Sequence, residues 1–163
     1  MLSIIAAVAK NNVIGINNNL PWKLSGDLKY FSKTTTGKSV LMGKNTFLSI
    51  INILGKPLPN RKNYVLSRTE KYLEGVEIVT DLQDFSKNNQ DEEVFIIGGA
   101  SVYNQALPLV NRLYITEVDC APKGDAFFPE FDINDWQLIS EEKHLKDDKN
   151  EYNYNFKIYD RKK

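Results

Sequence analysis

Hydrophobic positions in the first two thirds of the chain form short apolar runs, and amphipathic segments separate them. Leu2 to Ala9 is apolar except for Ser3, which is typical of a strand buried on both faces of a sheet. A polar loop from Asn11 to Leu20 follows, and the spacing from Ser25 to about Thr35 predicts a helix. The alternation continues, with strands predicted at 39–42, 63–67, 76–80 and 93–97 and helices at 44 to about 50, after Asp81, and from 98 to about 107.

The pattern changes after the last of these helices. Residues 112–118 alternate between apolar and polar, and 136–140 and 152–159 are also predicted strands with no helix between them. Glu141 to Glu151 is rich in charge and is interpreted as a solvated turn. The chain is therefore predicted to be an α/β protein. Its central sheet is mostly parallel with an antiparallel C-terminal edge, helices cover both faces, and residues 1–163 form a single domain.

Composition narrows the classes of partner. Twenty-one basic and 21 acidic residues give a formal net charge of zero, which argues against nucleic acid as the main partner. One cysteine and one histidine exclude the usual zinc sites, and the carboxylates lack metal-ligand spacing, so no metal is expected. No apolar run approaches the roughly 20 residues of a membrane helix. A cytoplasmic protein that does not bind membranes is expected.

Asp27 stands out because its neighbours are apolar. It falls in the first turn of the predicted helix, after a Pro21-Trp22 corner and on the same side as Leu28 and Phe31. One interpretation is local: Ser25 caps the helix and Asp27 favours the positive end of its dipole. The other is that Asp27 points into an apolar pocket, where its raised pKa would allow proton chemistry near neutral pH.

Three predicted strands end in glycine-rich or polar turns. These are Gly43-Lys44-Asn45-Thr46, Leu66-Ser67-Arg68 and Gly98-Gly99-Ala100-Ser101. Ligands bind beyond the carboxyl ends of strands in open α/β sheets, and glycine lets the backbone approach a phosphate. Together with Lys44 and Arg68, these turns suit a dinucleotide with an extra phosphate. Gly98-Gly99 taken alone is more simply a tight turn, and neither G-x-G-x-x-G nor a P-loop is present.

The sequence contains no pattern that is typical of nucleophilic catalysis. His144 is the only histidine, lies in the charged late segment and is interpreted as a surface residue. The nucleophile elbow G-x-S-x-G is absent. A pocket acid and a nucleotide cofactor remain, and this pair favours a redox step in which the cofactor supplies the difficult chemistry.

Ordered blocks along nearly the whole chain resemble the dihydrofolate reductase family, in its bacterial chromosomal type. Each block is modest alone, but their joint order and spacing are specific. The blocks are 4–9, Val13-Ile14-Gly15, Leu20-Pro21-Trp22, Asp27-Leu28 with Phe31, 40–47 with Ser49-Ile50, 57–63, 65–68, 96–103, 113–116, 123–125 and Phe128-Pro129.

The resemblance implies reduction of 7,8-dihydrofolate to tetrahydrofolate, with hydride transfer from NADPH to C6 and protonation at N5. Asp27 would accept hydrogen bonds from the pterin N3 and 2-amino groups and favour protonation at N5 through water. Trp22 would help to hold that water, and Thr116 would hydrogen bond to the Asp27 carboxylate. The expected catalytic residues are these three.

Further roles follow from the same resemblance. Arg61 would bind the α-carboxylate of the substrate's glutamate. The other substrate-binding residues would be Ile5, Leu28, Phe31, Ile50, Leu58 and Ile97, alongside Asp27. The cofactor-binding residues would be Ala7, Ile14, Gly43, Lys44, Asn45, Thr46, Leu66, Ser67, Arg68, Gly98, Gly99, Ala100, Ser101, Val102 and Tyr103. The family joins the pair matching Gly98-Gly99 by a cis peptide.

The resemblance also implies a lid from Gly15 to Leu20, with Asp125 hydrogen-bonded to its backbone when closed. Many bacterial members carry arginine where this chain has Ser101, so one cationic contact to the cofactor is missing. A monomer is expected. The alternatives are the related pyrimidine reductase of riboflavin synthesis and a non-catalytic nucleotide-binding protein. Trp22, Asp27 and Arg61 together argue against the first, and the presence of Asp27 argues against the second.

Overall fold

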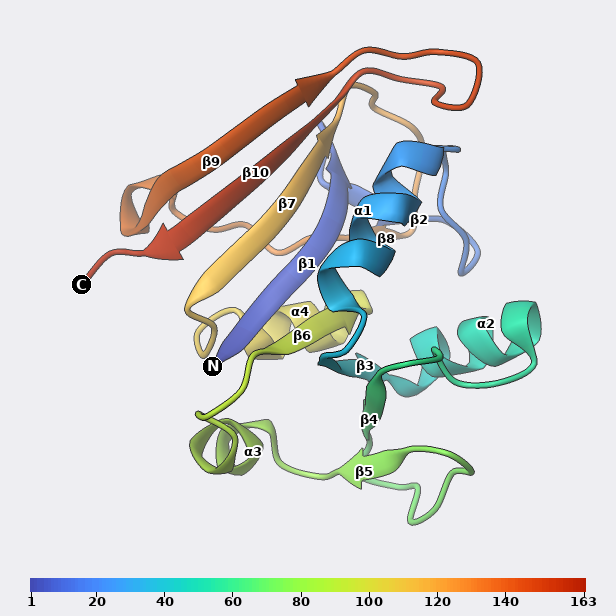
Figure 1. Ribbon diagram of the computed structural model, residues 1–163, viewed down its shortest axis with the longest axis vertical. Helices are drawn as coiled ribbons and strands as arrows, with labels where there is room; N and C mark the ends of the chain where they lie inside the picture. The colour runs from blue at the N-terminus through green and yellow to red at the C-terminus, as the bar shows by residue number, and fades with distance from the viewer.

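An eight-stranded sheet extends through the computed structural model, which describes residues 1–163 (Figure 1). The strand order is β5-β4-β3-β6-β1-β7-β10-β9. Its strands are β1 Leu2–Ala9, β3 Ser39–Gly43, β4 Lys62–Leu66, β5 Glu77–Val79, β6 Val94–Gly98, β7 Arg112–Val118, β9 Trp136–His144 and β10 Tyr154–Arg161. The helices are α1 Ser25–Thr35, α2 Lys44–Leu54, α3 Leu82–Asn88 and α4 Ala100–Ala106, with a 3₁₀ turn at Ile133–Asp135.

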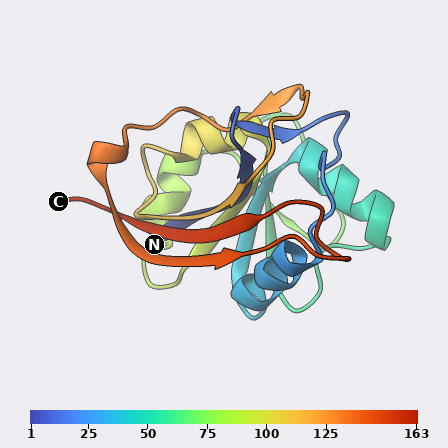
Figure 2. The ribbon, with the colours of Figure 1, turned by 90° about the horizontal axis from the view of Figure 1, so that it is seen from above.

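The pairing of the strands confirms the predicted fold class. The six strands β5, β4, β3, β6, β1 and β7 run parallel to one another, whereas β10 is antiparallel to both β7 and β9. In Figure 2, α1 lies on one side of the sheet, and α3 and α4 lie on the other. None of the helices is long and apolar enough to cross a membrane.

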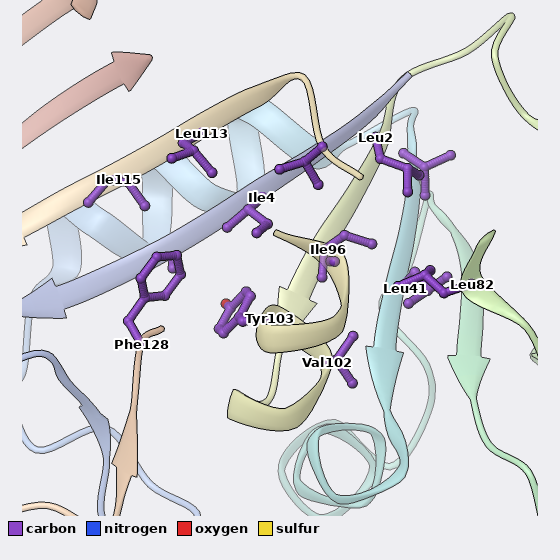
Figure 3. Packing of buried hydrophobic residues seen from close by; sticks show 14 of the residues in the cluster. Leu2, Ile4, Leu41, Leu82, Ile96, Val102, Tyr103, Leu113, Ile115 and Phe128 are labelled. Carbon is purple, nitrogen blue, oxygen red and sulfur yellow. The ribbon is translucent and has the colours of Figure 1, made fainter. Parts of the chain in front are cut away.

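Alternating residues of β1 belong to two hydrophobic clusters, one on each face of the sheet. Leu2, Ile4, Ala6 and Val8 pack in the cluster under α3 and α4, because side chains in a strand point to opposite faces in turn. Ile5 belongs to the cluster on the other face, with Phe47 of α2 and with Tyr30 and Phe31 of α1 packed against it. Figure 3 shows the first cluster, in which Tyr103 lies between Ile4 and Phe128. The apolar run at the N-terminus is thus a strand buried on both faces, as predicted.

Several boundaries differ from the prediction. The loop 11–20 contains a short strand β2, Val13–Gly15, which pairs with β8, Ala126–Phe127; strands of two or three residues carry no periodicity to detect. Helix α2 continues to Leu54 and ends at Gly55, whose φ of 74° is the left-handed conformation typical of a helix end.

The interpretation of 141–151 as a solvated turn is wrong for its first part. Residues 141–144 continue β9, which pairs with β10 through His144. β9 is the edge strand of the sheet, and most of its residues are exposed. Charged side chains are common on such edges because they discourage pairing with other chains, and this composition hid the strand.

Ser25 does not cap α1, so that part of the local interpretation of the helix start is also wrong. The cap position is Leu24, with no side-chain hydrogen bond, and Ser25 is the first helical residue. The amide of Gly26 instead donates to Oδ1 of Asn150, 2.9 Å away, in the turn between β9 and β10. Asn150 is 6% exposed, and its Nδ2 donates to Asp147 at 2.8 Å. The helix that carries Asp27 therefore begins on a cap supplied by a distant segment.

Asn150→Ala is expected to lower the free energy of unfolding by about 1–2 kcal/mol, because the Gly26 amide loses its acceptor and stays partly buried. Urea unfolding measures the change. Asn153→Ala is the matched control: its Oδ1 accepts a hydrogen bond from the Lys146 amide within the same turn, and its side chain makes no hydrogen bond with α1. An equal loss in both variants would show that the turn, and not the cap on α1, carries the effect.

Candidate active site

A single large cavity of about 890 Å³ opens beyond the carboxyl ends of β3, β4 and β6 and along one face of α1. Nearly every residue predicted for substrate, cofactor or lid lines it. These are Ile5, Ala7, Ile14, Gly15, Leu20, Asp27, Leu28, Phe31, Gly43, Lys44, Asn45, Thr46, Ile50, Leu58, Leu66, Ser67, Arg68, Ile97, Gly98, Gly99, Ala100, Ser101, Val102, Tyr103 and Asp125. Three do not line it: Trp22, Arg61 and Thr116.

Four lining residues were not predicted from the sequence, which are Ala6, Ser49, Gln105 and Ala126. Asn18 and Asn19 also line the cavity and belong to the predicted lid from Gly15 to Leu20. Helical spacing offered a signal for two of the four. Ser49 lies three residues after Thr46 in α2, and Gln105 lies four residues after Ser101 in α4, so each shares a face with a predicted residue. Ala126 belongs to β8, a strand that was not predicted.

Asp27 lies in the part of the cavity with the apolar side chains of Leu28, Phe31 and Ile5. Its Oδ1 accepts a hydrogen bond of 2.7 Å from Oγ1 of Thr116, which is 2% exposed on β7. Desolvation raises the pKa of Asp27 above its usual value, and the bond from Thr116 opposes that shift only in part. The pocket interpretation of this acid is therefore supported by its surroundings, and the predicted contact with Thr116 is present.

Trp22 lies in the segment before α1 and is buried, with 4% of its surface exposed. It packs with Leu24, Val118 and Tyr154 in a third apolar cluster. Its indole Nε1 has no hydrogen-bond partner within the protein. Because buried donors are nearly always satisfied, this N–H is suited to hold an ordered water.

Arg61 connects the end of α1 to the segment that carries Leu58. One guanidinium nitrogen donates to Oγ1 of Thr35 at 3.0 Å, and Nε donates to the carbonyl of Pro59 at 2.9 Å. These bonds fix the planar group beside the cavity and leave further N–H donors free for a carboxylate.

The far end of the cavity is formed by the turns after β3 and β4. β3 and β4 are parallel, and their last residues, Gly43 and Leu66, are paired. Lys44 and Ser67, which directly follow these residues, therefore lie side by side. The Lys44 ammonium forms an ion pair with Glu70, a contact that the sequence did not predict. The peptide between Gly98 and Gly99 is cis, as the family pattern implies.

Glycine is required where these turns meet. Gly98 has φ of 132°, and a Cβ there would lie 3.4 Å from Oγ1 of Thr46. A Cβ on Gly43 would approach Val102 to 3.0 Å. A side chain at either position would therefore crowd a residue that lines the cavity.

The loop from Gly15 to Leu20 covers one side of the cavity. The amide of Asn17 donates to Oδ2 of Asp125 at 3.0 Å, and the amide of Asp125 donates to the carbonyl of Gly15 at 3.0 Å. The predicted contact between Asp125 and the backbone of this loop is therefore present.

His144 lies at the end of β9, outside the cavity. Its ring stacks on Tyr154 with centroids 5.0 Å apart, and Nε2 lies 2.7 Å from Glu142. It is half-buried, so the surface interpretation understated its packing, but it takes no part in the cavity.

Comparison with known proteins places this geometry in a family. The family model described as dihydrofolate reductase matches residues 1–161. The dihydrofolate reductase of Bacillus subtilis is 44% identical over 99% of this chain and 95% of its own length. That of Staphylococcus aureus is 39% identical over 99% of each chain. A structure of dihydrofolate reductase from Enterococcus faecalis, complexed with NADP(H) and RAB-propyl, is 32% identical with a TM-score of 0.88, covering 100% of this chain and 97% of that one.

Proposed function

This chain belongs to the dihydrofolate reductase family, and we propose which of its residues carry out the NADPH-dependent reduction of 7,8-dihydrofolate to tetrahydrofolate. The named relatives support this activity over pyrimidine reduction in riboflavin synthesis and over a non-catalytic nucleotide-binding role. The observation that carries the proposal is the Asp27–Thr116 pair in the apolar part of the cavity.

Asp27 binds and orients the pterin ring. Thr116 occupies one of its oxygens, which fixes the carboxyl group and leaves its remaining lone pairs for the pterin N3 and 2-amino donors. Leu28, Phe31 and Ile50 line the same cavity and surround the rings with apolar side chains. Leu28 is 58% exposed because it faces this cavity.

The same group favours protonation of the pterin. C6 of the pterin would accept the hydride that NADPH supplies when it is bound. Desolvation raises the pKa of Asp27 toward the range where a carboxyl group exchanges protons near neutral pH. The buried indole N–H of Trp22 holds the water that connects Asp27 with N5. Asp27 thereby favours the protonated pterin without touching N5 directly.

The residues of the far end fit the cofactor. Gly43, Gly98 and Gly99 bring the backbone to the cavity wall, and helix α2 begins at Lys44 with its free N–H groups at that wall. Lys44 and Arg68 line the cavity beside Ser67 and provide positive charge for the phosphates. Ala7, Ile14 and Tyr103 would surround the nicotinamide.

The activity is tested by following the loss of NADPH absorbance with dihydrofolate as the substrate. We expect oxidation that depends on dihydrofolate, and no oxidation with the pyrimidine substrate of riboflavin synthesis. Oxidation with the pyrimidine alone would contradict the proposal.

Asp125→Ala is expected to slow hydride transfer and to speed the release of ligands, because the lid loses the acceptor of the Asn17 amide. Loss of one hydrogen bond to a charged acceptor corresponds to a change of roughly tenfold. Stopped-flow measurement of both steps checks this. Asp119→Asn, which removes an exposed acid paired with Lys10, is the control. Unchanged rates in Asp125→Ala would show that this contact does not govern the lid.

The proposal includes action as a monomer in the cytoplasm. The predicted residues for substrate and cofactor that line the cavity all come from one chain, which supports a site that one copy can form. The single cysteine, Cys120, is free and half-buried, which suits a reducing compartment. Sedimentation at micromolar concentrations tests the oligomeric state.

A further inference from the structure

The cavity contains few charged side chains. Asp27 and Asp125 are the lining acids, and Lys44 and Arg68 are the lining bases. Arg68 forms no ion pair within the protein. Lys44 is paired with Glu70, which does not line the cavity and has no part in the mechanism above. One of the two cations is thus already engaged by an acid of this chain.

The backbone brings Glu70 to this position. Ser67 directly follows β4, and its Oγ accepts hydrogen bonds from the amides of Thr69 at 3.3 Å and Glu70 at 3.1 Å. These bonds fold the turn 67–70 back toward the start of α2, where Lys44 is the first helical residue. The ion pair between Lys44 and Glu70 therefore depends on a hydrogen-bonded turn. It connects the segments that follow β3 and β4 at this end of the cavity.

Glu70 reduces the positive potential that Lys44 presents. A carboxylate in contact with an ammonium group cancels most of its charge for a third group nearby. A phosphate monoester carries close to two negative charges and would be repelled by Glu70 while it is attracted by Lys44. Ser101 lines the same cavity and is neutral, so it supplies no further cation. Arg68 is then the one lining cation that no acid of this chain offsets.

We infer that Glu70 is a specificity-determining residue, which acts through Lys44 to weaken binding of the extra 2′-phosphate and so lowers the preference for NADPH over NADH. The inference rests on the proposed placement of the cofactor. It concerns the 2′-phosphate because Lys44 and Ser67 directly follow β3 and β4. In the sheet, β6 and β1 separate these strands from β7, whose Thr116 is bonded to Asp27. The two cofactors differ only in that group, so an effect at this end should separate them.

Glu70→Gln tests the inference because glutamine keeps the size of the side chain and removes its charge. Both side chains of the pair are partly exposed, so solvent screening limits the effect. We expect the Kd of NADPH to fall by roughly threefold to tenfold, with the Kd of NADH unchanged within about twofold. The probes are NADPH and NADH themselves, titrated against the protein by tryptophan fluorescence at low ionic strength.

Glu77→Gln is the matched control. Glu77 pairs with Lys62 at 3.3 Å on the neighbouring strands, lies outside the large cavity and should leave both Kd values unchanged. A Kd for NADPH that stays constant or rises in Glu70→Gln would overturn the inference. An equal change for both cofactors would overturn it too.

Lys44→Met tests separately whether the 2′-phosphate binds at this end of the cavity, which the inference requires. This variant should weaken the binding of NADPH more than the binding of NADH. If Lys44→Met does not distinguish the two cofactors, the placement of the 2′-phosphate fails, and the inference fails with it. If Lys44→Met distinguishes them but Glu70→Gln does not, the placement stands and the role of Glu70 is refuted.

Discussion

Asp27→Asn is expected to reduce the turnover of dihydrofolate at pH 7 by about 10²- to 10⁴-fold while the Kd of NADPH stays nearly constant. Asparagine matches the shape of aspartate and can still accept the 2.7 Å bond from Thr116, but it cannot carry the charge that favours protonation of the pterin. Steady-state rates and an NADPH titration of the same preparation measure the two effects. Normal turnover at pH 7 would remove Asp27 from the mechanism.

The stability of this variant shows whether the acid is held in an unfavourable environment. Burial raises the pKa of Asp27 in the folded protein above its ordinary value of 3.8. At pH values between 3.8 and this raised pKa, the folded state therefore binds more protons than the unfolded state. Stability therefore falls as pH rises through that window, and at neutral pH the ionised group destabilises the fold. Asparagine does not titrate, so Asp27→Asn should be more stable than the parent at neutral pH.

That gain in stability should shrink as pH falls through the same window, and it should vanish below the ordinary pKa of the acid, where the parent side chain is protonated in both states. Urea unfolding at several pH values measures it. Asp119→Asn, an exposed acid on the surface, is the control for a general charge effect. A variant at Asp27 that is less stable than the parent at pH 7 would contradict the desolvation that the mechanism requires.

Arg61→Met is expected to raise the KM for dihydrofolate by roughly tenfold to a hundredfold, with little change in the Kd of NADPH. The guanidinium would bind the glutamate carboxylate of the substrate, and hydrogen bonds to charged groups contribute about 1.5–3 kcal/mol. Steady-state kinetics with dihydrofolate provide the measurement.

A dihydropterin that lacks the glutamate tail separates this role from a structural one. Arg61 also donates to Thr35 and to the carbonyl of Pro59, so its loss could disturb the end of α1. Binding of the carboxylate predicts that KM rises for dihydrofolate alone. Equal changes for both substrates would assign Arg61 to the fold and not to recognition.

The sequence was sufficient to predict the features that depend on periodicity and on strand order. The apolar run of β1 and the three polar strand ends place Gly43, Ser67 and Gly98 at one edge of a parallel sheet, and that edge forms the cavity. Asp27 was recognisable because an acid among apolar neighbours is unusual.

Other features depend on contacts between distant segments, and local patterns carry no signal for them. Ser25 has the composition of a helix cap, yet Asn150 supplies the acceptor from 124 residues away. The pairing of Lys44 with Glu70 depends on how the turn after β4 folds. Neither contact can be predicted from the local sequence pattern, because each depends on the folded arrangement of separate segments.

The central claim is that Asp27 makes the pterin easier to protonate before hydride reaches it. Single-turnover hydride transfer, measured with saturating NADPH and dihydrofolate from about pH 5 to pH 9, tests it most directly. We predict that the rate for the parent protein rises as pH falls and then levels off, whereas Asp27→Asn is far slower and continues to rise toward the lowest pH. Profiles of the same shape and height in both proteins would contradict the claim.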